Sequence, residues 1–172
     1  MQLGYSSSSQ SPIEPTGFFT GILIRPIIFG IVIDTVATVA LTTFYYMAYV
    51  AKDVTANGAG AEDAFAAYWS STDGLVASLL LGSLGTLIGG FYAAYKAGKL
   101  HMKHGALVGI GSIFLGLLLQ AGDAESNTPE WFMALSFAAA IPAGALGGFF
   151  AEMLQNVTGG TTGAPDSGRA KV

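Results

Sequence analysis

The chain has 172 residues, of which 52% are hydrophobic and only 10% are charged, and its net charge is −4. Globular domains average about 25% charged residues, so this composition indicates a membrane protein. The acidic balance argues against nucleic acid as a partner, because binding to a phosphate backbone needs clustered Lys and Arg. The lack of cysteine excludes a disulfide framework, a thiolate nucleophile and a Cys-ligated metal.

The first 16 residues are polar, with four consecutive serines and two prolines, and they predict a disordered tail. After a short apolar segment, the first span is expected over 27–50, which as a helix would be roughly 36 Å long against a hydrocarbon core of about 30 Å. It contains one ionisable residue, Asp34. Its end is rich in aromatic residues, which are typical of the membrane interface. These are Phe44, Tyr45, Tyr46 and Tyr49.

The loop that follows, 51–73, is acidic. Within it, Phe65, Tyr68 and Trp69 lie at helical spacing behind an acidic first turn, which predicts a short interfacial helix. Ser71, Thr72 or Asp73 can cap the next helix.

Three further spans are expected over 75–97, 105–121 and 131–154, the last one interrupted by Pro142. The span at 105–121 would be only roughly 25 Å long, so it must recruit the turn before it or lie where the bilayer thins. The membrane domain then covers 17–155, and 156–172 is expected to be a polar, Gly-rich tail.

The basic residues near the span ends divide six to one between the two sides of the membrane. Lys and Arg are enriched in cytoplasmic loops, so this division predicts that both termini are cytoplasmic. The expected fold class is therefore all-α, a four-helix transmembrane bundle with N-in, C-in topology. The majority side carries Arg25, Lys96, Lys99, Lys103, Arg169 and Lys171, and the other side carries only Lys52.

Small residues recur at steps of three and four in the last three spans, in the manner of a glycine zipper. Such faces let helix backbones approach closely in lipid, so they predict tight packing of these spans on one another. The alternative is a glycine-lined groove that admits a partner helix or a lipid. The first span has Gly30 alone and is expected to be bulky and peripheral. The predicted helix-packing residues are Gly82, Gly85, Gly89, Gly105, Gly109, Gly116, Gly144 and Gly147.

Asp34 is the candidate functional residue, because a carboxylate inside the membrane costs on the order of 3 kcal/mol and usually faces protein or water. The helical rise places Gly89 and Ser112 at its depth, with Thr86 one turn away. Asp34 could therefore accept hydrogen bonds from Ser112 or Thr86. Two interpretations remain, a proton or cation site and a structural interhelical hydrogen bond. No second acid or base is expected within the spans to relay a proton.

The short connection after the second span carries Lys96, Lys99 and Lys103, which predict contact with anionic lipid headgroups. His101 and His104 make an incomplete zinc site, so neither a metal nor another cofactor is expected. No nucleophile with a base, no phosphate-binding loop and no acid pair is present, so no enzymatic activity is expected.

The segment Gly89-Gly90-Phe91-Tyr92-Ala93-Ala94, followed by Lys96 and by His104-Gly105-Ala106-Leu107-Val108-Gly109, resembles a group of uncharacterised small bacterial four-helix membrane proteins. The resemblance covers about 30 residues around the second and third spans, and it implies a bacterial inner membrane with no assigned activity. The glycine-rich four-span subunits of mitochondrial protein import are similar in layout and length. Their arginine-and-aspartate signature between spans is missing here.

The sequence thus predicts a non-enzymatic integral membrane protein, a small subunit or scaffold that acts by helix association. Its expected partners are the lipid bilayer and either further copies of itself or a larger membrane complex. The alternative is a small oligomeric channel or transporter that uses Asp34.

Overall fold

The computed structural model describes residues 17, 20–52, 60–121 and 128–159, and it is helical without any strand in these ranges. The predicted tail at 1–16 lies outside the described residues, as does 160–172. The helices are, in chain order, α1 (Ile24–Tyr45), the π-helix η1 (Tyr46–Val50), α3 (Ala61–Ser70), α4 (Thr72–Ala97), α5 (His101–Ala121) and α6 (Glu130–Gly159).

Four helices are long and apolar enough to cross a membrane, which confirms the predicted number of spans. They are Ile24–Val50, Thr72–Ala97, His101–Leu119 and Glu130–Thr158. The third span does recruit the turn before Gly105, because α5 begins at His101. The fourth helix is continuous through Pro142 and passes the predicted start of the C-terminal tail, ending at Gly159.

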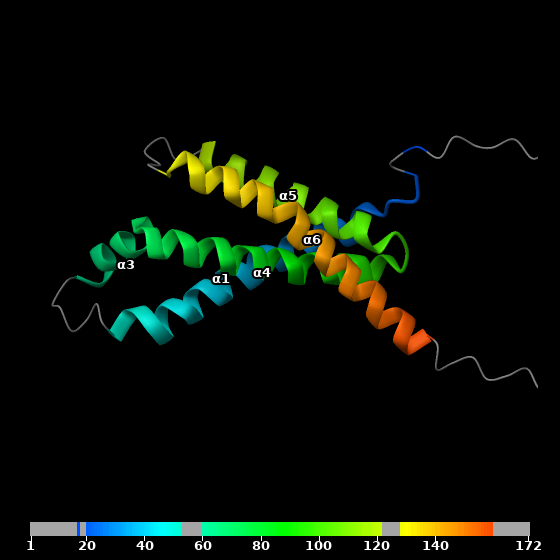
Figure 1. Cartoon of the computed structure of the whole chain (residues 1–172), viewed down its shortest axis with the longest axis horizontal. Coiled ribbons are helices and arrows are strands. Elements are labelled where there is room, and N and C mark those ends of the chain that lie inside the picture. The colour runs from blue at the N-terminus through cyan, green and yellow to red at the C-terminus, as the bar shows by residue number, and fades with distance from the viewer. Residues whose placement is uncertain (1–16, 18–19, 53–59, 122–127, 160–172) are drawn as a thin grey trace, which may run out of the picture.

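The spanning helices alternate in direction, so both ends of the described chain lie on the same side of the bundle (Figure 1). This side also holds the turn between α4 and α5, and we call it the turn end. The opposite side holds α3 and is called the α3 end. At the turn, Gly98 ends α4 in the left-handed conformation, with φ +63°, which favours a residue without a Cβ.

Helix α4 lies at the centre of the bundle, where it packs against α1, α5 and α6. Close approach between backbones requires glycine at several of these contacts. A Cβ on Gly89 of α4 would lie closer than 3.0 Å to the carbonyl oxygen of Gly30 on α1, and one on Gly147 of α6 would lie that close to Leu87 of α4. The first span packs closely on α4 at this one contact, and it is still the least buried of the four long helices, as expected of a peripheral span. The single glycine of α1, Gly30, allows this close contact because it faces Gly89 of α4, so neither helix has a Cβ between the two backbones.

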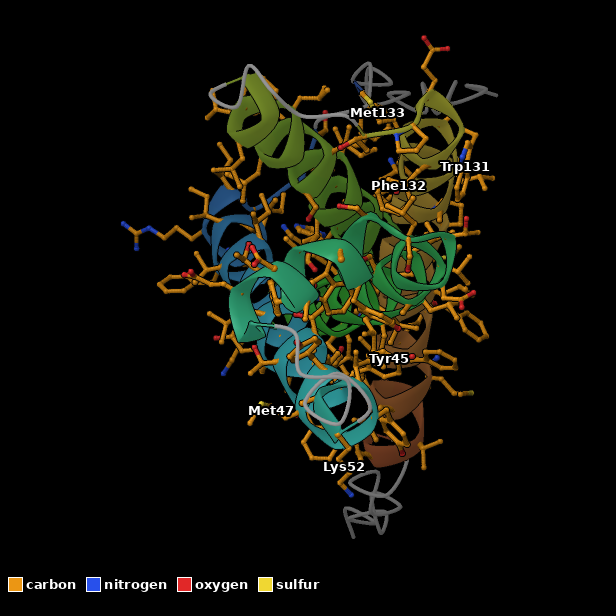
Figure 2. The ribbon with its side chains drawn as sticks, turned by 90° about the vertical axis from the view of Figure 1, so that its left-hand side faces the viewer. Tyr45, Met47, Lys52, Trp131, Phe132 and Met133 are labelled. Carbon is orange, nitrogen blue, oxygen red and sulfur yellow. The ribbon has the colours of Figure 1, made fainter. Side chains whose placement is uncertain are left out.

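The predicted short helix is present as α3, whose first turn carries Glu62 and Asp63. Ser71 then caps α4, because its Oγ accepts a hydrogen bond of 3.1 Å from the Gly74 N–H. The Tyr68 hydroxyl donates to the Tyr45 hydroxyl over 3.0 Å, which ties α3 to the end of α1. Figure 2 looks onto this end, with Tyr45 on α1 and Trp131 at the start of α6. Interfacial aromatic residues are expected at such a boundary.

Candidate functional site

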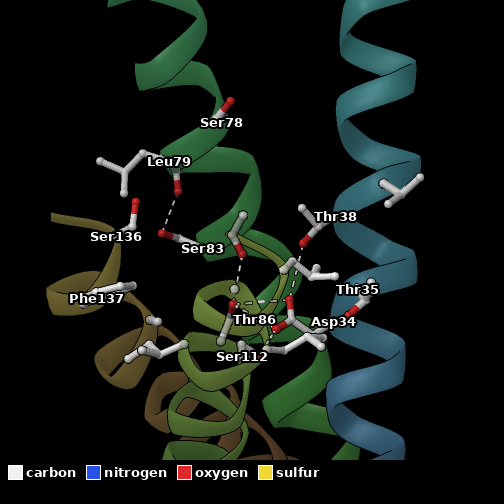
Figure 3. Close-up of a pocket in the computed structure, with 17 residues that line it drawn as sticks. Asp34, Thr35, Thr38, Ser78, Leu79, Ser83, Thr86, Ser112, Ser136 and Phe137 are labelled. Carbon is white, nitrogen blue, oxygen red and sulfur yellow. Dashed lines mark hydrogen bonds between the residues drawn. The ribbon is translucent and has the colours of Figure 1, made fainter. Parts of the chain in front are cut away.

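A partly open pocket of about 300 Å³ lies between the helices in the α3 half of the bundle, and all four long helices contribute to its wall (Figure 3). Its lining combines apolar side chains with hydroxyl groups and a single carboxylate. From α1 come Asp34, Thr35, Thr38 and Val39, from α4 Ser78, Leu79, Gly82, Ser83 and Thr86, from α5 Ser112, Ile113, Leu115, Gly116 and Leu119, and from α6 Ser136, Phe137 and Ala140.

Asp34 lies at the end of the pocket farthest from α3. Its side chain is only 5% exposed, and it is the one buried carboxylate among the residues that the structure describes. A glycine on α4 makes room for this side chain, since a Cβ on Gly89 would come within 3.0 Å of the Asp34 Cβ. The chain therefore places its buried acid against the glycine face of the central helix.

Three hydroxyl groups from three helices surround the carboxylate. Thr86 on α4 lies 3.2 Å from both Asp34 oxygens, and Thr38 on α1 lies 3.3 Å from Oδ1. Ser112 on α5 donates to Oδ2. The structure thus brings together the three predicted residues Asp34, Thr86 and Ser112. Thr38 was missed, although its position four residues after Asp34 puts it on the same face of α1.

Two of these hydroxyls have a second acceptor in reach. Thr86 Oγ1 lies 3.0 Å from the Gly82 carbonyl, and Ser112 Oγ lies 3.0 Å from the Val108 carbonyl. Because a hydroxyl has one hydrogen and two lone pairs, each can turn its hydrogen to its own helix and present lone pairs to the pocket. The site can then offer up to five oxygens, two from Asp34 and three from its hydroxyl neighbours, to a bound cation.

The bundle is tightly packed between Asp34 and the turn end. Ala93, Ala94 and Val108 are fully buried there, and a Cβ on Gly30 would come within 3.0 Å of both Ala93 and Val108. The polar pocket therefore ends at Asp34, and its lining continues only toward the α3 end.

Charged residues differ between the two ends of the bundle. Glu62, Asp63 and Asp73 lie on or beside α3, and Glu130 begins α6 at the same end. The turn end carries the exposed residues Lys96, Lys99 and Lys103 of the predicted headgroup site, with Lys96 Nζ 5.9 Å from the centre of the Tyr92 ring. A cation that approaches the pocket from the α3 end thus meets mostly negative charge, which favours its local concentration.

The predicted helix-packing glycines fall into two groups. Gly85, Gly89, Gly105, Gly109, Gly144 and Gly147 lie where a Cβ would come closer than 3.0 Å to a neighbouring helix. By contrast, Gly82 and Gly116 line the pocket, and a Cβ at either position would meet no atom within 4 Å. Small residues in this bundle thus occupy two environments, backbone contacts and the wall of the pocket.

His104 is a buried group that the sequence interpretation placed in an exposed basic connection. It lies in the first turn of α5, is fully buried, and accepts a hydrogen bond of 2.9 Å on Nε2 from the Leu23 N–H. His101 instead lies 2.8 Å from the Gln155 Oε1 on α6, so the two imidazoles do not share a site. His104 is thus a second buried ionisable group, at the turn end of the third span, and the expectation that no second acid or base relays a proton stays a prediction. The spacing could have indicated this burial. His104 lies four residues before the buried Val108, so the two side chains share one face of the helix.

Within the described ranges, no group of three His, Cys, Asp or Glu residues is placed to hold a metal ion. The chemistry that the site offers is cation or proton binding by oxygen atoms. Comparisons with protein-family models, with curated proteins and with solved structures found no match for this chain.

Proposed function

We propose that the chain is a non-enzymatic integral membrane protein that binds a proton or small cation at Asp34 and acts as a small channel or transporter. The observation that carries this proposal is the position of a buried carboxylate at the closed end of a pocket lined by all four spans. Intramembrane acids usually serve such pathways. A hydrogen bond between helices would account for Asp34 and its partners, but it would not account for about 300 Å³ of space beside them.

The proposed orientation is N-in, C-in, because Arg25, Lys96, Lys99 and Lys103 gather at the turn end. The pocket would then open toward the outer side of the membrane. The resemblance around the second and third spans supports a bacterial inner membrane as its location. In this arrangement the basic turn end faces the cytoplasmic leaflet, where its lysines would bind anionic lipid headgroups.

The test is the uptake of protons and Na⁺ by liposomes that contain the purified full chain, compared with Asp34→Asn and with empty liposomes. Glu152→Gln is the matched control, because it removes a carboxylate from α6 outside the pocket. We expect flux in the parent protein and in Glu152→Gln, with loss of flux in Asp34→Asn. Equal flux in the parent and Asp34→Asn, or none in the parent, would contradict the proposal.

A second candidate is a small subunit or scaffold that acts by helix association. Gly82 and Gly116 favour it, because they leave space that no atom within 4 Å of their Cβ positions fills. Under this proposal the remaining glycine faces hold the four helices together, and a further copy or another subunit completes the assembly. Mass measurement after purification in mild detergent discriminates the two. A stoichiometric complex with another subunit supports the scaffold, a stable ring of this chain favours the channel, and a monomer that copurifies with nothing contradicts the scaffold.

A further inference from the structure

We propose that the pocket binds a monovalent organic cation, an ammonium group that carries a small apolar body. This inference rests on the proposed function and names its class of ligand. The volume of about 300 Å³ is the first argument. One water occupies about 30 Å³ in the liquid, so the space is far larger than a bare metal ion or proton needs. It lies at the lower end of the range of small-molecule pockets.

The distribution of polar atoms is the second argument. Asp34, Thr38, Thr86 and Ser112 gather at the closed end, where they form one hydrogen-bonded group. The rest of the wall is mostly apolar, with Val39, Leu79, Leu115, Leu119 and Phe137, and it also includes the hydroxyl residues Thr35, Ser78, Ser83 and Ser136. The nearby Ser83 hydroxyl donates 2.7 Å to the Leu79 carbonyl of its own helix, so its hydrogen is already used. A ligand that matches this wall has one charged end and a largely apolar remainder that lies beside a few hydroxyl groups.

Charge is the third argument. Asp34 is the sole charged residue among those that line the pocket, so a single positive charge balances the site. Ca²⁺ and Mg²⁺ are usually bound by more oxygen ligands, commonly from several carboxylates. An ammonium group donates up to three hydrogen bonds. The Asp34 oxygens and the Thr86 and Ser112 lone pairs can accept them once these hydroxyls turn to the Gly82 and Val108 carbonyls.

Gly82 and Gly116 provide a way to change the space without changing the carboxylate. They lie on α4 and α5 in the pocket wall, and a Cβ at either position has no atom within 4 Å. A Cβ at either position begins in open space beside the pocket, so a larger side chain can reduce the pocket volume without first meeting a helix backbone. The two glycines therefore leave space that the apolar body of the ligand would occupy.

The experiment measures equilibrium binding of labelled n-hexylammonium to the purified full chain in detergent, with 1-hexanol and Na⁺ as competitors. We expect saturable binding at one site per chain, weakened at least about tenfold by Asp34→Asn and unchanged by Glu152→Gln. Gly116→Ala should weaken it slightly and Gly116→Leu at least about tenfold, with the thermal unfolding transition of both variants retained. 1-Hexanol should compete poorly, and Na⁺ should compete only at concentrations well above that of n-hexylammonium, because it reaches the carboxylate without the apolar contacts.

The outcomes separate the two proposals. Asp34-dependent Na⁺ or proton flux without saturable hexylammonium binding overturns the organic cation and leaves the proposed function standing. Binding that persists in Asp34→Asn, or that 1-hexanol displaces as well as the ammonium does, is partition into an apolar space and also overturns it. If neither Asp34-dependent flux nor Asp34-dependent binding of any of these cations occurs, both proposals fail.

Discussion

The Ser112 hydroxyl on α5 donates a hydrogen bond to the Asp34 carboxylate on α1, although 78 positions separate the two residues in the sequence. Thr86 on α4 lies 3.2 Å from the same carboxylate. One side chain therefore joins three spanning helices at the closed end of the pocket. Inside the bundle the medium is of low dielectric, so the contributions of the hydroxyls are expected to depend on one another.

We expect Thr86→Val and Ser112→Ala each to lower the free energy of unfolding by roughly 0.6 to 1.7 kcal/mol. The double variant should lose more free energy of unfolding than the sum of the two single losses. In each single variant one of the two hydroxyls still bonds to the buried carboxylate, whereas the double variant leaves only Thr38. Unfolding by sodium dodecyl sulfate in mixed micelles measures these values. Ser83→Ala is the control, since its hydroxyl donates to the Leu79 carbonyl. Additive effects of Thr86→Val and Ser112→Ala, within about 0.3 kcal/mol, would contradict the coupling.

Alanine substitutions should separate the two groups of glycines. A Cβ on Gly144 of α6 would come closer than 3.0 Å to the Gly105 carbonyl of α5, so Gly144→Ala should destabilise the bundle by about 1 to 3 kcal/mol. Gly116→Ala meets open space and replaces glycine with a better helix former, so its stability should be equal or higher. Thermal unfolding in detergent compares the two variants. A larger loss in Gly116→Ala than in Gly144→Ala would show that the assignment of the two environments is wrong.

The helical rise is what made part of the site predictable from the sequence. A rise of about 1.5 Å per residue fixes the depth of each side chain along an apolar span, and depth alone placed Ser112 at the level of Asp34 and Thr86 within one turn of it. The rotation of each helix about its axis is set by packing against its neighbours. The sequence therefore did not predict the pocket, nor that Gly30 of α1 packs against Gly89 of α4.

The burial of His104 shows the same limit at a helix end. Lys99 and Lys103 beside it are typical of an exposed connection, so the local composition predicted a loop. The structure extends α5 to His101, and the rotation of this first turn points His104 at the Leu23 backbone. Only the tertiary contact between α5 and the chain before α1 determines this orientation.

Tyr68 should titrate at unusually high pH. Burial raises the pKa of Tyr68 from 10.0 to about 12, and the hydrogen bond to Tyr45 and the charges of Tyr45 and Asp73 act in the same direction. Tyr68 loses its proton near pH 10 in the unfolded chain and near pH 12 in the folded chain. The contribution of the Tyr68 hydroxyl to folding stability is therefore complete below pH 10 and is lost as pH rises through about 12.

Tyrosinate absorbance, followed as pH rises, measures this titration. Tyr68→Phe should remove a step centred near pH 12, and Tyr45→Phe should move that step to lower pH because the hydrogen bond is lost. Tyr49→Phe, on an exposed side chain of η1, should leave the step in place. A step that survives in Tyr68→Phe would assign the high pKa to another tyrosine.

His104 should hold the start of α1 against α5 through a neutral imidazole. Nε2 accepts the Leu23 N–H over 2.9 Å, so it carries no hydrogen, and the hydrogen on Nδ1 points to the Leu100 carbonyl 3.1 Å away. His104→Leu keeps an apolar side chain but removes the acceptor. It should lower the free energy of unfolding by about 1 to 3 kcal/mol, because the Leu23 N–H then lacks a partner. His104→Gln should recover part of this loss, because its amide oxygen can take the place of Nε2.

Hydrogen exchange of the Leu23 amide, measured by NMR on the full chain in detergent, separates a lost hydrogen bond from a general loss of packing. In His104→Leu the Leu23 amide should exchange faster, and the amides around Asp34, on the same helix but at the pocket, should be affected much less. His104→Gln should slow the exchange at Leu23 again. If His104→Leu leaves exchange at Leu23 unchanged, or if it speeds exchange equally along all of α1, the imidazole is not the specific partner of this amide.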